Sequence, residues 1–147
     1  MSKTYFEVSV KYRKTTESGV TKIVTEPYLV DALTFTEAES RINEKMAELV
    51  SEDFKVTNIR VANYSEVIGE DDGDMWFKSK VSLLAYDEES GKERKTNIFL
   101  LVHACDAKNA YDNTIEAMKD TVGDYSIPAI SETRIVAVFP YVSEEVL

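Results

Sequence analysis

An internal repeat limits what this sequence can fold into more than any other feature. When the chain is compared with itself at an offset of about 71 residues, aromatic, glycine and apolar positions of the first half fall on similar positions of the second half. Tyr5-Phe6 matches Trp76-Phe77, and Leu29-Val30 matches Leu101-Val102. We therefore interpret the chain as a duplicated unit.

The two copies span residues 4–68 and 75–140, and the polar segment 69–74 links them. A length of 147 residues is typical of one domain, so we expect residues 1–147 to form a single domain made of both repeats. Each copy is predicted to run strand, strand, helix, strand.

Period-two alternation predicts the first strand of each copy. Phe6, Val8 and Val10 alternate with polar residues, which is typical of a half-buried strand. A turn follows at residues 15–19, and the chain returns in a second strand. Pro27 lies in this returning strand and has no N–H to donate, so we expect it at a sheet edge or a bulge.

The helix of each copy has a marked start. Thr34 with Glu37 and Thr36 with Glu39 both fit a capping box. Thr34 aligns with Asp106, another good N-cap residue, and is therefore the predicted cap. The predicted buried faces are Ala38, Ile42, Met46 and Leu49 in the first copy and Ala110, Thr114, Met118 and Val122 in the second.

The C-terminal part of each copy is predicted to be extended. Gly123 is expected to stop the second helix. The strands after the helices are expected at 54–61 and 125–130, and segments 64–68 and 135–139 are expected to continue or pair with them.

These elements predict a pseudo-twofold α+β fold with two helices on a mixed or antiparallel sheet layer. A strand–helix–strand crossover makes its two strands parallel, and the preceding hairpin adds an antiparallel neighbour. A ferredoxin-like core with two added strands satisfies this pattern. Two small sheets packed back to back satisfy it equally well.

Composition and charge narrow the possible functions. The formal net charge of −10 argues against broad binding to nucleic acids or anionic membranes. The single Cys allows no internal disulfide and favours a reducing compartment. No stretch resembles a signal peptide or a membrane span, so we expect a cytoplasmic protein, or one carried inside a phage-infected cell.

The sequence has no clear catalytic motif, so we predict that the protein is not an enzyme and has no cofactor and no metal site. The glycines form no phosphate-binding loop or dinucleotide fingerprint. His103 and Cys105 are two residues apart on a strand and share a face, as a Cys–His dyad would require. Their counterparts Asp31 and Leu33 favour a simpler interpretation, a polar strand end followed by a core residue. The acidic linker lacks the ligand spacing of a calcium loop.

Aromatic and basic side chains gather on the predicted outward face of the first strand of each copy. This candidate binding surface comprises Tyr5, Lys11, Arg13, Trp76, Lys78 and Lys80. An aromatic ring beside lysines on a strand can stack nucleic-acid bases. The same rings can instead cover the sheet or be buried in a homodimer.

Several segments resemble a family of uncharacterised proteins from gut bacteria related to Bacteroides and from their phages. The resemblance is carried by residues 28–39, by Asn63-Tyr64-Ser65-Glu66, by Ile130-Ser131-Glu132-Thr133 and by Phe139-Pro140-Tyr141. It covers nearly the whole chain. It implies a domain of unknown function and no catalytic residues.

The sequence therefore predicts a non-enzymatic binding or adaptor module that acts through a protein–protein interface or as a homo-oligomer. The main alternative is weak binding of single-stranded nucleic acid on the aromatic and basic strand face. A third hypothesis is an enzyme with a pocket at the junction of the two copies, where Asp31 and His103 would be the equivalent polar pair.

Overall fold

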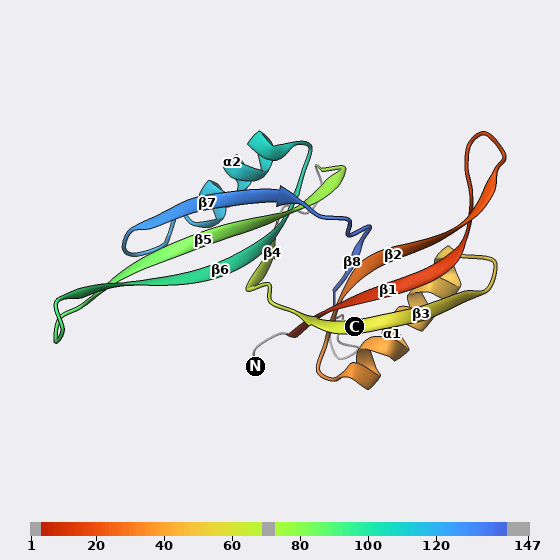
Figure 1. Cartoon of the computed structure of the whole chain (residues 1–147), viewed down its shortest axis with the longest axis horizontal. Helices are drawn as coiled ribbons and strands as arrows, with labels where there is room; N and C mark the ends of the chain where they lie inside the picture. Colours follow the sequence, from red (N-terminus) through yellow and green to blue (C-terminus); the bar gives the residue numbers. More distant parts are fainter. Residues whose placement is uncertain (1–3, 69–72, 141–147) are drawn as a thin grey trace, which may run out of the picture. The chain divides into compact units, whose positions relative to one another are not determined.

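The computed structural model of the chain describes residues 4–68 and 73–140, so positions 69–72 of the predicted linker lie outside the described residues. The chain divides into two compact units (Figure 1). Unit 1 comprises Met1–Ala62 and Arg134–Leu147, and unit 2 comprises Asn63–Thr133. That both copies form a single domain stays a prediction.

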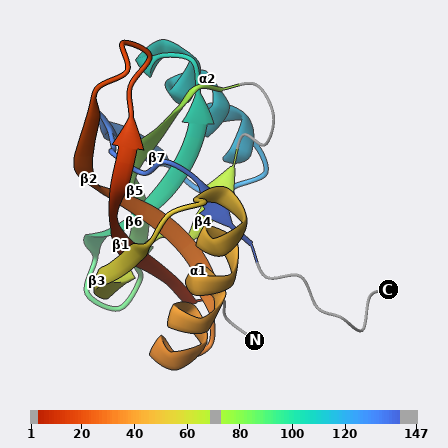
Figure 2. The ribbon, with the colours of Figure 1, turned by 90° about the vertical axis from the view of Figure 1, so that its right-hand side faces the viewer.

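Unit 1 is a four-stranded mixed sheet with one helix. Its elements are β1 (Thr4–Thr15), β2 (Thr21–Ala32), α1 (Phe35–Leu49), β3 (Phe54–Ala62) and β8 (Val138–Phe139). The strand order is β3-β1-β2-β8, with β1 antiparallel to both neighbours and β8 parallel to β2. Helix α1 lies against one face of this sheet (Figure 2).

Unit 2 repeats this arrangement. Its elements are β5 (Met75–Asp87), β6 (Lys92–Ala104), α2 (Ala107–Ala117), β7 (Tyr125–Glu132) and β4 (Glu66–Ile68). The order β4-β6-β5-β7 matches that of unit 1 read in reverse. Each sheet has a bulge, which lies between β1 and β3 in unit 1 and between β5 and β7 in unit 2. The predicted α+β class with two helices and mixed sheets is confirmed.

The short last strand of each copy is placed differently from the prediction. Residues 64–68 and 135–139 were expected beside the strands that precede them in the chain. Instead β4, at the end of the first copy, pairs with β6 of unit 2, and β8, at the end of the second copy, pairs with β2 of unit 1. Each copy thus supplies the fourth strand of the other copy's sheet, because β1 and β5 leave β2 and β6 with one free edge each.

Each unit has its own apolar core between helix and sheet. The core of unit 1 includes Phe6, Val8, Val10, Tyr28, Val30, Ala38, Ile42 and Met46. The core of unit 2 includes Phe77, Val81, Leu100, Val102, Ala110 and Met118. Burial of these alternating strand residues and of one helix face is the main force that holds each unit together.

Two predicted core positions near the helix ends are wrong. Leu49 is the last residue of α1 and is 61% exposed. Helix α2 ends at Ala117, earlier than the predicted stop at Gly123, because the N–H of the C-cap Met118 bonds to carbonyls of the last turn and the chain leaves the helix there. Val122 follows this turn and is 99% exposed.

Pro27 was expected at a sheet edge or a bulge, and it lies in β2 between β1 and β8, with its nitrogen on the side away from β1. The N–H of Leu29 points to the outer edge of β2, where it donates to the carbonyl of Ala137. Pro27 precedes Leu29 by two residues, so its nitrogen faces the same edge. Its missing N–H therefore costs the β1–β2 ladder nothing, and its carbonyl accepts the N–H of Val136 at 2.9 Å.

Candidate binding surfaces

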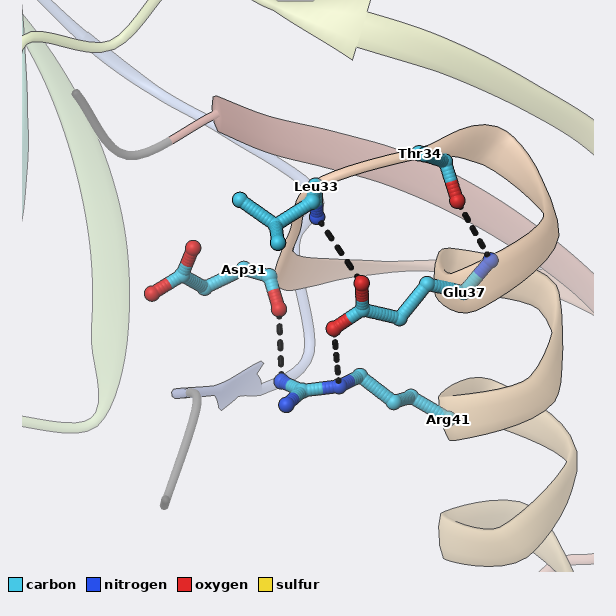
Figure 3. A network of polar contacts seen from close by, with 5 residues as sticks. All are labelled: Asp31, Leu33, Thr34, Glu37 and Arg41. Atoms are coloured by element: carbon cyan, nitrogen blue, oxygen red, sulfur yellow. Dashed lines mark hydrogen bonds and ion pairs between the residues drawn. The ribbon is translucent and has the colours of Figure 1, made fainter. Parts of the chain in front are cut away.

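A cluster of polar contacts closes the end of β2 and starts α1 (Figure 3). The hydroxyl of Thr34 accepts the N–H of Glu37 at 3.1 Å, which confirms Thr34 as the N-cap. The Glu37 carboxylate accepts the N–H of Leu33 at 3.3 Å and pairs with Arg41. Arg41 also donates to the carbonyl of Asp31 at 2.6 Å.

Unit 2 builds the same cluster from different residues. Asp106 accepts the N–H of Asn109 at 2.8 Å, and the Asn109 side chain accepts the N–H of Cys105 at 3.1 Å. Asn113 donates to the carbonyl of His103 at 3.3 Å. The backbone groups of His103 and Cys105 therefore link the end of β6 to the start of α2. This is a structural role for both positions.

The side chains of this region differ from the sequence-based interpretation. Leu33 was expected in the core but is 66% exposed, and Cys105 is exposed as well. Both follow the end of a buried strand, where the chain turns outward to begin the helix. Within residues 4–68 and 73–140, no three His, Cys, Asp or Glu side chains gather as metal ligands would.

The aromatic and basic face of β5 has the predicted register. Phe77 and Val81 face the core, so Trp76, Lys78 and Lys80 lie on the opposite face of the sheet. These groups already have neighbours there. The Trp76 ring stacks on His103 with centroids 4.3 Å apart, and the Lys78 ammonium lies 4.5 Å from the centre of the Phe99 ring.

On the equivalent face of β1, side chains near the start of the strand are covered and those near its end are exposed. Tyr5 points away from the core cluster but is only 8% exposed, so it presents little surface to a ligand. Glu7 forms an ion pair with Arg60, at 2.5 Å. Lys11 and Arg13 are exposed and lie farther along the strand.

Lys11 and Arg13 line an open hollow of about 670 Å³ in unit 1, which we call the unit 1 notch. The residues that line the notch surround Phe54, where β3 begins. The β1–β2 hairpin extends past the start of β3 (Figure 1). Its full lining is Lys11, Tyr12, Arg13, Ile23, Glu52, Asp53, Phe54 and Lys55. It therefore combines cations, an exposed aliphatic side chain, aromatic rings and two acids.

The cations of the unit 1 notch are neighbours that form no ion pair with any residue of the described segments. Lys11 and Lys55 are direct partners in the β1–β3 register. Among the described residues, neither these lysines nor Arg13 forms an ion pair, whereas Lys14 on the same hairpin pairs with Glu26 at 3.3 Å. Like charges directly opposite on a sheet are destabilising.

In the two described segments, neither helix has the length and apolar character that a bilayer crossing needs.

Comparison with known proteins places the chain in a family. The family model for a domain of unknown function (DUF4494) matches residues 4–141. The chain belongs to the DUF4494 family. No protein with a curated description and no solved structure matches it.

The DUF4494 match brings no known activity, so function is argued from the geometry of the two units. The sequence-based surface of six residues falls into two groups, one on β1 and one on β5, and the structure adds new members to the first. Lys55 and Ile23 were missed because the register of β3 and β2 on β1 decides that they lie beside Lys11 and Arg13. The sequence signal for this site was the pair of cations, Lys11 and Arg13, on the outward face of the first strand.

Proposed function

We propose that this DUF4494 protein is a non-enzymatic binding or adaptor module that contacts a partner protein through the unit 1 notch. The observation that carries the proposal is the set of three unpaired cations beside an exposed aliphatic side chain. Lys11, Arg13 and Lys55 have no ion-pair partner in the described part of the chain, and Ile23 is 61% exposed.

The arginine and the aromatic rings of the notch are residue types that protein interfaces favour. Arg and aromatic side chains are enriched at such interfaces, and a large apolar side chain next to them supplies area to bury. Arg13 and Ile23 are cross-strand partners, and Tyr12 and Phe54 line the same hollow. We place this activity in the cytoplasm, where the exposed thiol of Cys105 stays reduced.

Site-specific photo-cross-linking in the native cell tests the proposal. A photoreactive amino acid at Ile23 should give a discrete adduct with a partner protein. The matched control is Leu49, which has the same exposed fraction of 61% and lies in the same unit but outside the notch. Equal adducts from both positions, or none from Ile23, would count against the proposal.

Self-association is the simplest form of such an interface. The outer edge of β2 before Pro27 and the outer edge of β6 before Phe99 extend beyond the short strands β8 and β4. Open sheet edges of this kind can pair with a second chain. Light scattering tests this version, and a monomer at high concentration would exclude it.

The alternative function is weak binding of single-stranded nucleic acid on the β5 face. Trp76 is partly exposed beside Lys78 and Lys80, which supports this hypothesis. The stack on His103 counts against it, because one side of the Trp76 ring already has a neighbour. Titration with single-stranded DNA and RNA, followed by the fluorescence of this single Trp, tests it; a saturable, salt-sensitive quench would favour nucleic acid.

A further inference from the structure

We propose that the unit 1 notch recognises an acidic segment of its partner protein. A carboxylate of that segment lies between Lys11 and Lys55, and an adjacent aliphatic side chain packs against Ile23. This inference rests on the proposed function, since it names the chemistry of the partner at the same site.

The first step concerns the electrostatic repulsion between Lys11 and Lys55 in the free protein. Directly opposite residues of an antiparallel ladder have Cβ atoms about 5 Å apart. Lys11 and Lys55 occupy such a position, and no acid among the described residues forms an ion pair with either. A carboxylate bound between the two ammonium groups would add two attractions that offset their mutual repulsion.

The second step is that the fold does not require this pair. Ser82 follows Trp76 by as many residues as Lys11 follows Tyr5, and its partner on β7 is Ser126. Unit 2 therefore has two neutral side chains at the place where unit 1 has two lysines. Ser82 also donates to Asn97 at 2.7 Å, so this position is fully accommodated without charge.

The third step is the apolar neighbour. Ile23 is the cross-strand partner of Arg13, which places an exposed aliphatic side chain next to the cationic row. Alternate residues of an extended peptide point the same way, so a peptide could present a carboxylate and an aliphatic group to these neighbours. Burying Ile23 adds the hydrophobic contribution that an isolated surface ion pair lacks.

The fourth step explains why the notch favours a peptide ligand over a nucleic-acid backbone. Glu52 and Asp53 line the same hollow as the three cations, and the chain carries a net charge of −10. A nucleic-acid backbone presents negative charge at every phosphate and would meet these acids. A peptide can present a carboxylate to the lysines and a neutral or basic group to Glu52 and Asp53.

Fluorescence anisotropy with defined probes tests the inference on the full chain. The probe is a short fluorescein-labelled peptide of Glu and Thr with one central Leu. We expect saturable binding that weakens at least about tenfold in the double variant Lys11→Ser plus Lys55→Ser, as loss of a charge-assisted contact predicts. A peptide with Ser in place of Leu should also bind more weakly.

Two control measurements distinguish loss of the binding site from a general loss of positive charge. The variant Lys14→Ser plus Lys22→Ser removes the same net charge from unit 1 at two positions that do not line the notch, and it should keep most of the affinity. The Lys11→Ser plus Lys55→Ser variant copies the serine pair of unit 2, so it should unfold at the same temperature as the parent or higher.

Three results would overturn the inference: equal loss of affinity in both double variants, tighter binding of the same peptide with Lys in place of Glu, or tighter binding of oligothymidylate. A notch-specific cross-link from Ile23 together with any of these would leave the proposed function standing and refute only the acidic partner. Tight, notch-dependent peptide binding without a cross-link in the cell would instead refute the proposed protein partner.

Discussion

Gly73 shows how a single residue is constrained by a neighbouring backbone. A Cβ atom at this position would lie 2.3 Å from the nitrogen of Ala104 and 2.7 Å from its Cα. These are main-chain atoms at the end of β6, so they cannot move aside as a flexible side chain would. Gly73 is therefore required for the close approach at the start of β5.

Gly73→Ala is expected to lower the free energy of unfolding of unit 2 by about 1–3 kcal/mol, because the added methyl must displace the end of β6. Denaturant unfolding followed by Trp76 fluorescence measures the change. Asp74→Ala is the control, since Asp74 is exposed next to the same site. Equal stability of Gly73→Ala and the control would contradict the expected clash.

Tyr12 is a residue whose protonation is tied to the fold of unit 1. Burial raises the pKa of the Tyr12 hydroxyl above its ordinary value, and the hydrogen bond that it donates to Glu26 raises it further. Burial also raises the pKa of the neighbouring Tyr28. The folded state therefore holds these protons more tightly than the unfolded chain does.

A raised folded-state pKa gives stability that is complete below the unfolded pKa and is lost as the pH rises above it. Unfolding temperatures should thus fall steeply above about pH 10, where unfolded tyrosines ionise. In Tyr12→Phe this fall should be shallower, although the variant loses a hydrogen bond at neutral pH. Parallel pH profiles of parent and variant would show that Tyr12 is not linked to folding.

At the scale of elements, the helix starts show how one geometry is made by two sets of residues. Thr34 and Glu37 make the contacts of α1 that Asp106 and Asn109 make for α2. Each cap satisfies a backbone N–H that has no partner within its helix. The same order of elements and the equivalent cap contacts in both units support the interpretation of the chain as a repeat.

Thr34→Ala is expected to lower the free energy of unfolding by about 0.5–2 kcal/mol through loss of the cap. Thr36→Ala is a matched control with the same chemical change, because Thr36 is exposed within the first turn of α1. Its effect should be a few tenths of a kcal/mol. Thermal unfolding measures the loss of stability in both variants. A larger loss in Thr36→Ala than in Thr34→Ala would assign the cap to Thr36.

At the scale of the whole molecule, the exchanged strands tie the two halves of the sequence together. Phe139 of β8 stacks on Tyr28 in the core of unit 1, with ring centroids 5.6 Å apart. Ile68 of β4 packs against the core of unit 2. Each of these residues comes from one copy of the repeat and stabilises the unit built mainly by the other.

Phe139→Ala is expected to reduce hydrogen-exchange protection in unit 1, and Ile68→Ala in unit 2, each by about 1–3 kcal/mol. Exchange measured by mass spectrometry assigns the loss to a unit. Val122→Ala should change neither unit, because Val122 is almost fully exposed. Loss of protection confined to the copy that carries the substitution would contradict the exchange of strands β4 and β8 between the two copies. Equal loss in both units would indicate the single cooperative domain expected from the sequence.

Local patterns in the sequence determined most of the elements and very little of the candidate site. Period-two alternation placed Phe6, Val8 and Val10 in the core, and the alignment of Thr34 with Asp106 selected the correct cap. Both depend on neighbours within a few positions along the chain. Lys11, Arg13 and their outward register were predictable for the same reason, whereas the burial of Tyr5 was not.

Only the tertiary structure decided which strands pair and therefore which side chains meet. Nothing in the local pattern of residues 64–68 or 135–139 states that they join the sheet of the other copy, because strand pairing depends on which edge is free after the core has formed. The same holds for Lys55, whose position opposite Lys11 follows from the register of β3 on β1. The sequence by itself determined the α+β class and most of the elements, and long-range pairing created the unit 1 notch.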